Sequence, residues 1–172
     1  MLRGTRWRGR GIQAFQYMLQ NAQQGPQAYW ECATLPSESA WAGMHPHSGT
    51  GDCPHLFGPA LSEKVLIESP IAERSDGTVI IGRGIPSEWN APGQRIEITD
   101  VPLSVRRRFG YAMTSASGKI DIEFTGDIPL GQIWVDLPVF CGKRVKPSVG
   151  TYDSTEQRVV LPATTRKVSI SL

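Results

Sequence analysis

The sequence lacks a long apolar run, a strong net charge and a framework of cysteines. Its 172 residues carry 18 Lys and Arg against 16 Asp and Glu, so the formal charge is only +2. A charge this close to neutral does not by itself point to a nucleic-acid or membrane partner. No stretch approaches the roughly 18 consecutive apolar residues of a membrane-spanning helix. We therefore expect neither nucleic acid nor a membrane among its partners.

Cysteine is scarce and widely spaced. Cys32, Cys53 and Cys141 are an odd number, which does not suit the disulfide framework of a small secreted protein. We expect buried free thiols that pack as small apolar side chains, with a single Cys32–Cys53 bridge left open for an exported protein. No apolar segment follows the early arginines, so no secretory signal is visible. These features favour the cytoplasm without determining the location.

Acidic residues are absent before Glu31, and four arginines are crowded at the start: Arg3, Arg6, Arg8 and Arg10. An Arg-rich, acid-free start is one mark of a mitochondrial presequence. Serine is missing there, however, and glutamines recur as they would on the solvated face of an ordinary helix. We therefore favour a basic loop followed by a helix.

Helical periodicity is confined to the first part of the chain. Apolar residues recur at helical spacing over 11–24, and a Gly-Pro pair then ends that helix. A second helix is expected over 59–68, because proline suits a first helical position. Its apolar stripe is Phe57, Leu61 and Val65. Between the helices lies a loop over 33–56, and loops of this length are often functional.

After residue 69, short alternating strands replace the helices. Residues 119–125 alternate most clearly, with Ile120, Ile122 and Phe124 on one face and Asp121 and Glu123 on the other. The other expected strands are 78–81, 95–99, 101–105, 132–137, 158–161 and 167–172. Glycines and prolines, 18 and 13 in number, mark turns between them. This pattern predicts an antiparallel β-sandwich.

The expected fold is α+β and mainly β, with a helical segment over 1–69 and a β-sandwich over 70–172. Two amphipathic helices and a loop cannot enclose a core of their own. Their apolar faces must pack on the sandwich, on another chain, or on helices that precede this sequence in a longer protein.

The long loop and its edges hold most of the reactive side chains. The metal-ligand types there are Cys32, His45, His47, Cys53 and His55. A structural zinc site drawn from them is the inorganic alternative. No pair has the tight Cys-x-x-Cys spacing of such sites, so we expect no metal and no cofactor.

The pair Trp30-Glu31 has more specific chemistry. An indole offers a face on which a sugar ring can stack. A glutamate beside it can act as a general base toward water, or accept hydrogen bonds from sugar hydroxyls.

Two segments around this pair carry a family resemblance. The run Tyr29-Trp30-Glu31, a Gly-rich loop and then residues 51–61 (GDCPHLFGPAL) resemble the last helical hairpin of α/α-toroid glycoside hydrolases. This six-hairpin superfamily includes glucoamylase-like and rhamnosidase-like enzymes. Residues 64–68 and 79–89 are similar to the exit of these enzymes into a C-terminal β-sandwich.

The resemblance implies that this chain is the C-terminal portion of a glycoside hydrolase that acts on a carbohydrate. Glu31 would match the position of the catalytic base. Asp52 and His55 would contact sugar hydroxyls, and Trp30 would be the stacking platform. In such enzymes the general acid comes from an earlier helix or loop. The chain alone would then be catalytically incomplete and would need an N-terminal helical domain.

The alternative is a carbohydrate-binding or scaffolding β-sandwich without catalysis. Trp41, Trp89 and Trp134 would then be the sugar platforms, with Trp134 facing away from its apolar neighbours in the strand. The triplet Arg106-Arg107-Arg108 could bind phosphate or a polyanion, although such a run is also typical of an exposed strand end. Asp121 and Glu123 have the spacing to hold calcium, but a solvated outer face is the simpler interpretation.

Overall fold

The computed structural model describes residues 5–25, 28–29, 31–33, 49–50 and 54–172. The predictions made for Trp30, Trp41, His45, His47, Asp52 and Cys53 lie outside these residues. Contacts divide the chain into two units. One consists of Met1–Arg8 with Glu68–Leu172, and the other of Gly9–Ile67.

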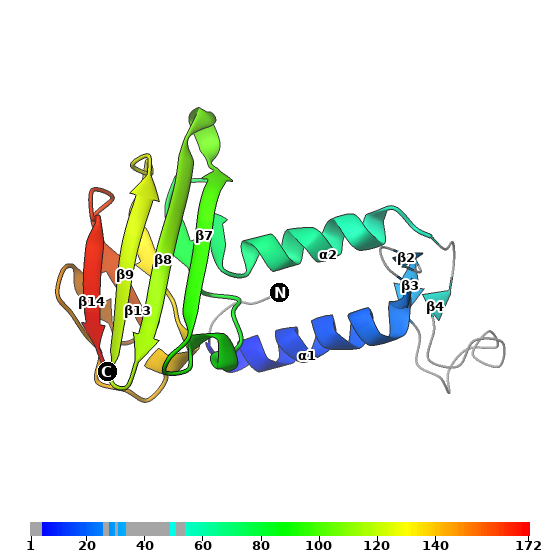
Figure 1. The fold of residues 1–172 in the computed structure, drawn as a ribbon, viewed down its shortest axis with the longest axis horizontal. Coiled ribbons are helices and arrows are strands. Elements are labelled where there is room, and N and C mark those ends of the chain that lie inside the picture. The colour runs from blue at the N-terminus through cyan, green and yellow to red at the C-terminus, as the bar shows by residue number, and fades with distance from the viewer. Residues whose placement is uncertain (1–4, 26–27, 30, 34–48, 51–53) are drawn as a thin grey trace. The chain divides into compact units, whose positions relative to one another are not determined.

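Two helices and two short strand pairs form the first part of the fold. Helix α1 spans Thr5–Ala22 and α2 spans Phe57–Glu68. The antiparallel pairs are β1 (Gln23–Gly25) with β2 (Ala28–Tyr29) and β3 (Cys32–Ala33) with β4 (Gly49–Thr50). In Figure 1 the short strands lie at the end of the helix pair where α1 stops and α2 starts.

Both predicted helices are confirmed, but each starts earlier than expected. Helix α1 begins at Thr5 rather than at residue 11. Arginine is a good helix former, and an interior glycine costs only about 1 kcal/mol relative to alanine, so Gly9 and Gly11 do not stop the helix. Helix α2 begins at Phe57 and holds Pro59 in its first turn. Proline is tolerated there because an N–H in that turn has no intrahelical acceptor.

The apolar stripe predicted along α2 lies mostly at the surface. Phe57 and Leu61 are 69% and 59% exposed. Ser62 is the buried residue of this helix, and its hydroxyl donates to a carbonyl one turn earlier at 2.8 Å. The same hydroxyl lies 3.9 Å from the sulfur of Met18 in α1. The helix therefore directs a small polar side chain toward α1.

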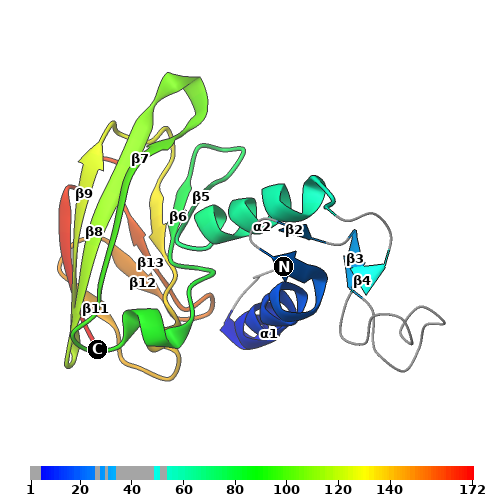
Figure 2. The same ribbon diagram turned by 45° about the vertical axis from the view of Figure 1, so that its right-hand side comes forward.

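Two five-stranded sheets form the larger unit, and Figure 2 shows them as separate layers. The first sheet has the order β12-β13-β10-β6-β5: Thr151–Asp153, Arg158–Leu161, Ile133–Val135, Val79–Ile81 and Ile71–Glu73. The second has the order β11-β14-β9-β8-β7: Lys146–Pro147, Lys167–Ser171, Lys119–Gly126, Arg108–Ala116 and Arg95–Pro102. Short 3-10 turns lie at Ser87–Asn90, Ser104–Arg106 and Pro138–Phe140.

Side chains of both sheets contribute to one hydrophobic cluster. Strand β9 supplies Ile120, Ile122 and Phe124, each at most 3% exposed, while the residues between them are exposed. The alternation predicted for residues 119–125 is confirmed. From β8, Tyr111 is 1% exposed and its hydroxyl donates to the carbonyl of Pro70 at 3.0 Å. The fold is thus mainly β with two helices, as expected.

Three predictions about the strands were wrong. The first sheet is mixed rather than antiparallel, because β10 pairs in parallel with β6. Strands β5, β8, β11 and β12 were missed. In β8, small residues separate the buried aromatic and Met side chains, which weakens the hydrophobic signal. Residues 101–105 do not form a separate strand. Strand β7 instead continues through an irregularity between Ile98 and Val101 and ends at Pro102.

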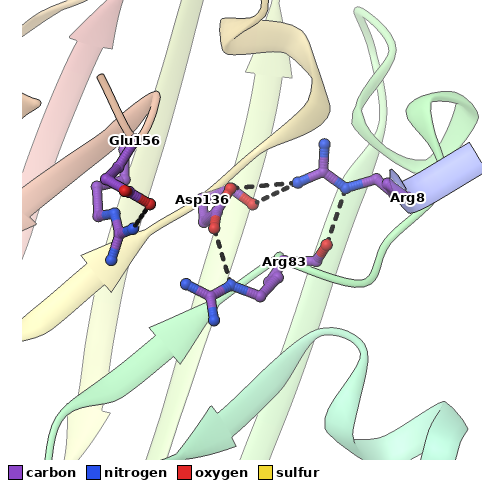
Figure 3. A network of polar contacts seen from close by, with 5 residues as sticks. Arg8, Arg83, Asp136 and Glu156 are labelled. Atoms are coloured by element: carbon purple, nitrogen blue, oxygen red, sulfur yellow. Dashed lines mark hydrogen bonds and ion pairs between the residues drawn. The ribbon is translucent and has the colours of Figure 1, made fainter. Parts of the chain in front are cut away.

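A buried ion network joins the start of α1 to the larger unit (Figure 3). The Asp136 carboxylate, 3% exposed, pairs with Arg83 Nε at 2.9 Å and with Arg8 Nη2 at 3.3 Å. The Arg8 guanidinium also donates to the carbonyls of Arg83 at 2.8 Å and Asp136 at 3.2 Å. Burial lowers the pKa of Arg8, and the charge of Asp136 opposes that shift. Asp136 thus compensates a guanidinium that has almost no contact with water.

Candidate functional site

Glu31 lies in a bend between β2 and β3, and its side chain is exposed. Tyr29, two residues before it, is only 6% exposed. Just after Glu31, β3 pairs with β4, so that Cys32 lies opposite Thr50. The exposed Glu31 side chain therefore lies in the chain between a buried residue and a strand pair.

The backbone joins the Glu31 segment to the segment that begins α2. The amide of His55 donates to the carbonyl of Tyr29 at 2.8 Å. The imidazole is half-buried and packs against Phe57, with ring centroids 5.5 Å apart and planes tilted by 47°. Of the predicted site residues, Glu31 and His55 thus belong to segments in direct contact. Trp30 and Asp52 lie outside the described residues.

This arrangement has two chemical capacities. A carboxylate exposed to water can take a proton from a water molecule or accept hydrogen bonds from hydroxyl groups. A histidine, here His55 on the segment bonded to Tyr29, can donate or accept a hydrogen bond through its ring nitrogens. Neither capacity requires a cofactor.

No metal centre is found within the described residues. None of them form a group of three or more His, Cys, Asp or Glu side chains that could hold an ion. Three of the five residues weighed for zinc, His45, His47 and Cys53, are outside those residues. Cys141 is a free thiol and exposed, so the expectation of a buried thiol was wrong for this residue. The turn that follows Phe140 carries the thiol outward.

The tryptophans predicted as sugar platforms have different surroundings. Trp134 packs against two guanidinium groups, those of Arg158 and Arg74, at 4.3 and 4.9 Å from its ring centroid. Its indole also donates to Gln132 at 3.1 Å. A ring occupied in this way is not an open stacking face. Trp89 is 44% exposed.

The two acidic residues of β9 form ion pairs on the outer face of the second sheet. Asp121 pairs with Lys119 at 2.9 Å, and Glu123 pairs with Lys167 at 2.8 Å. A hydrogen bond from the Ser169 hydroxyl lowers the pKa of Asp121, and one from Lys167 to Glu123 raises the pKa of Lys167. Both carboxylates thus have protein partners, consistent with the solvated outer face expected from the sequence.

One cluster combines residues that are distant in the sequence. Arg106 and Arg107 line a cavity together with Arg166 and Asp127. The arginine triplet was visible in the sequence, but Arg166 follows a different strand and no sequence signal links it to the triplet.

Neither a family model, nor a curated protein, nor a solved structure matches this chain. Among the described residues, no helix has both the length and the apolar character needed to cross a membrane.

Proposed function

We propose that this chain is the C-terminal portion of a glycoside hydrolase, in which Glu31 is the general base and residues 70–172 form a structural β-sandwich. The hydrogen bond from the His55 amide to the Tyr29 carbonyl, 2.8 Å long, carries the proposal. It joins the two segments whose sequences resemble the catalytic end of α/α-toroid glycosidases, beside an exposed carboxylate.

The surface of α2 gives independent support. Its side chains Phe57, Leu61, Leu66 and Ile67 are between 47% and 69% exposed, and Leu56, just before the helix, is 82% exposed. Isolated apolar residues are common on protein surfaces, but here Phe57 and Leu61 share one side of a short helix while Leu66 and Ile67 point to other sides. A helix that is apolar on several sides is typical of one that other elements cover. The inner helices of a toroid have neighbours on both sides. An N-terminal helical domain would supply the missing cover.

In the proposed reaction, the Glu31 carboxylate takes a proton from a water molecule as the water oxygen attacks the anomeric carbon. A carboxylic acid from the N-terminal domain protonates the leaving oxygen on the other side of the ring. If the configuration is inverted, the two carboxyl groups lie roughly 6.5–9.5 Å apart. Trp30 would stack on the sugar, while Asp52 and His55 would bind its hydroxyls.

The test is hydrolysis of a polysaccharide panel by the whole polypeptide that the gene encodes. Glu31→Gln keeps the size of the side chain but removes the base, so we expect kcat to fall by about 10²–10⁴-fold. Glu63→Gln is the matched control, because Glu63 is an exposed glutamate on α2. It should leave kcat unchanged. Equal activity of the two variants would refute the role of Glu31.

The chain expressed alone separates this proposal from the alternative of a binding or scaffolding module. As the partial enzyme proposed here, it should show no turnover on any glycan. A non-catalytic module would bind glycan through residues 70–172, and Glu31→Gln would have no effect on the whole polypeptide. Full turnover by the chain alone would show that the site is complete without a further domain.

A further inference from the structure

A cavity of about 530 Å³ lies at one end of the second sheet, where three arginines converge. Its lining consists of Arg106, Arg107, Gly126, Asp127, Ile128 and Arg166. These residues come from the turn before β8, the turn after β9 and the residue before β14. The cavity belongs entirely to the larger unit and is separate from Glu31.

Specific hydrogen bonds hold the walls of this cavity together. Arg107 donates to the carbonyl of Ile128, and Arg166 donates to the carbonyl of Gly126 at 2.8 Å. Gly126 has φ +79°, and a Cβ there would lie 2.3 Å from the carbonyl oxygen of Arg108. Only glycine permits this close approach of the two turns. The guanidinium groups of Arg107 and Arg166 are therefore anchored, and each keeps further N–H donors free of these bonds.

The turn that carries Arg106 has an unusual backbone. Val105 and Arg106 both have φ +58°, a left-handed conformation that is a marked outlier for a β-branched residue. Val105 is 73% exposed, so its side chain gains little packing in return. The turn is held from the other side by Glu73, whose carboxylate accepts hydrogen bonds from both the amide and the hydroxyl of Ser104 at 2.7 Å. Strain kept in place in this way commonly marks a functional segment.

The charges of the lining residues do not cancel. Asp127 is the only carboxylate in the lining against three guanidinium groups, and it accepts the backbone amide of Arg108 at 2.8 Å. Within the part of the chain that the structure describes, the Arg106 guanidinium has no hydrogen-bond or ion-pair partner. The cavity thus combines excess positive charge with an unused planar donor.

We propose that this cavity binds an oxyanion, in the form of a sulfate, phosphate or carboxylate group. Guanidinium groups from different turns can donate to separate oxygens of one such group, and each planar fork can donate two parallel hydrogen bonds. Arg106 supplies the donor that has no other partner, while Arg107 and Arg166 supply charge from fixed positions. The site is independent of the proposed hydrolysis at Glu31.

The experiment titrates the full chain by calorimetry with sodium sulfate, phosphate and glucuronate at constant ionic strength, with glucose as the uncharged control. We expect saturable binding to a single site by at least one anion and none by glucose. Binding of sulfate and phosphate, but not of glucuronate, would indicate a site for a tetrahedral anion. Tighter binding of glucuronate would indicate the carboxylate of an acidic sugar.

The decisive variant is Arg106→Gly. Glycine suits the left-handed backbone at this position, so the variant removes the guanidinium without disturbing the turn. We expect its affinity to fall at least tenfold, and that of Arg166→Ala to fall similarly. Arg95→Ala is the matched control, an exposed arginine of the same sheet that pairs with Glu97 outside this cavity. Its affinity should stay within twofold of the unaltered chain. An equal loss in Arg95→Ala, or no saturable binding of any anion, would overturn the proposal.

Discussion

The buried Asp136 carboxylate provides the sharpest test of what holds the larger unit together. Replacing it with alanine removes both of its ion pairs. Arg83 is a quarter exposed and can turn toward water, whereas the Arg8 side chain is only 5% exposed. Arg8 would keep its hydrogen bonds to two backbone carbonyls but lose its only charged partner among the described residues. The main cost of Asp136→Ala is therefore an uncompensated guanidinium in the protein interior.

Removing one partner of a buried ion pair typically destabilises a protein by about 3–5 kcal/mol. Because Arg8 keeps its hydrogen bonds to two backbone carbonyls, we expect Asp136→Ala to lower the free energy of unfolding by about 3 kcal/mol, the lower end of this range. For a unit of this size, each kcal/mol lowers Tm by about 4 °C, so we expect a fall of roughly 12 °C. The matched control is Asp121→Ala. That carboxylate is half exposed and pairs with Lys119 at the surface, so its removal should cost at most about 1 kcal/mol.

The assay is urea unfolding of the full chain followed by circular dichroism, with Tm measured in parallel. The double variant Arg8→Met/Asp136→Leu adds a second readout. It removes both charges from the interior. Its loss of unfolding free energy should be smaller than the sum of the losses in Arg8→Met and Asp136→Leu measured separately. Equal costs for Asp136→Ala and Asp121→Ala, or simple additivity in the double variant, would refute the view that Asp136 compensates a buried Arg8.

Three further predictions concern single residues of the larger unit. Burial raises the pKa of the Tyr111 hydroxyl above its ordinary value near 10, so the unfolded chain releases that proton first and stability falls as pH rises above about 10. In urea titrations at several pH values, the free energy of unfolding of Tyr111→Phe should fall less steeply above about pH 10 than that of the unaltered chain. Near neutral pH the variant should be less stable by about 1 kcal/mol, because it lacks the hydrogen bond to Pro70. Gly126→Ala should destabilise by at least about 2 kcal/mol in the same urea assay, because the new Cβ would meet a backbone oxygen in a left-handed turn. Cys141 should react with a thiol reagent in the native protein, as peptide mapping would show, and Cys141→Ser should change stability by less than about 0.5 kcal/mol.

Much of the β-rich part could be predicted because its strands alternate strictly. In strand β9, Ile120, Ile122 and Phe124 alternate with charged residues, so only one face of the strand can be buried without burying charges. Strand β8 has no such contrast, because glycine, alanine and threonine separate its buried aromatic, Met and Ser side chains. The parallel pairing of β6 with β10 was beyond prediction for another reason. Alternation determines which face of a strand is buried, but it contains no information about which strand lies next to it or in which direction.

The sequence indicated which segments contribute to the candidate site, but not which atoms of those segments contact each other. Sequence indicated Glu31 and His55 separately, each through its neighbours. The hydrogen bond from His55 to Tyr29 is made by backbone atoms, which every residue has, so no residue type could signal it. The arginine cavity shows the same limit more strongly. Arg106 and Arg107 stood out as a charged run, whereas Arg166 enters the cavity only because of where β14 begins in the sheet.

The two proposals make opposite demands on the rest of the protein, and this difference makes them separable. Glu31 is part of the Gly9–Ile67 unit, and the proposed hydrolysis needs a general acid that a further helical domain would supply. The arginine cavity draws all its lining from the larger unit, and its walls are already held together by hydrogen bonds to backbone carbonyls. Anion binding should therefore survive in any preparation in which the two sheets are folded, whereas hydrolysis should require the whole polypeptide. A preparation that binds sulfate but hydrolyses no glycan would meet both expectations. If the folded chain alone bound no anion, the result would count against the cavity and would leave the proposed role of Glu31 unaffected.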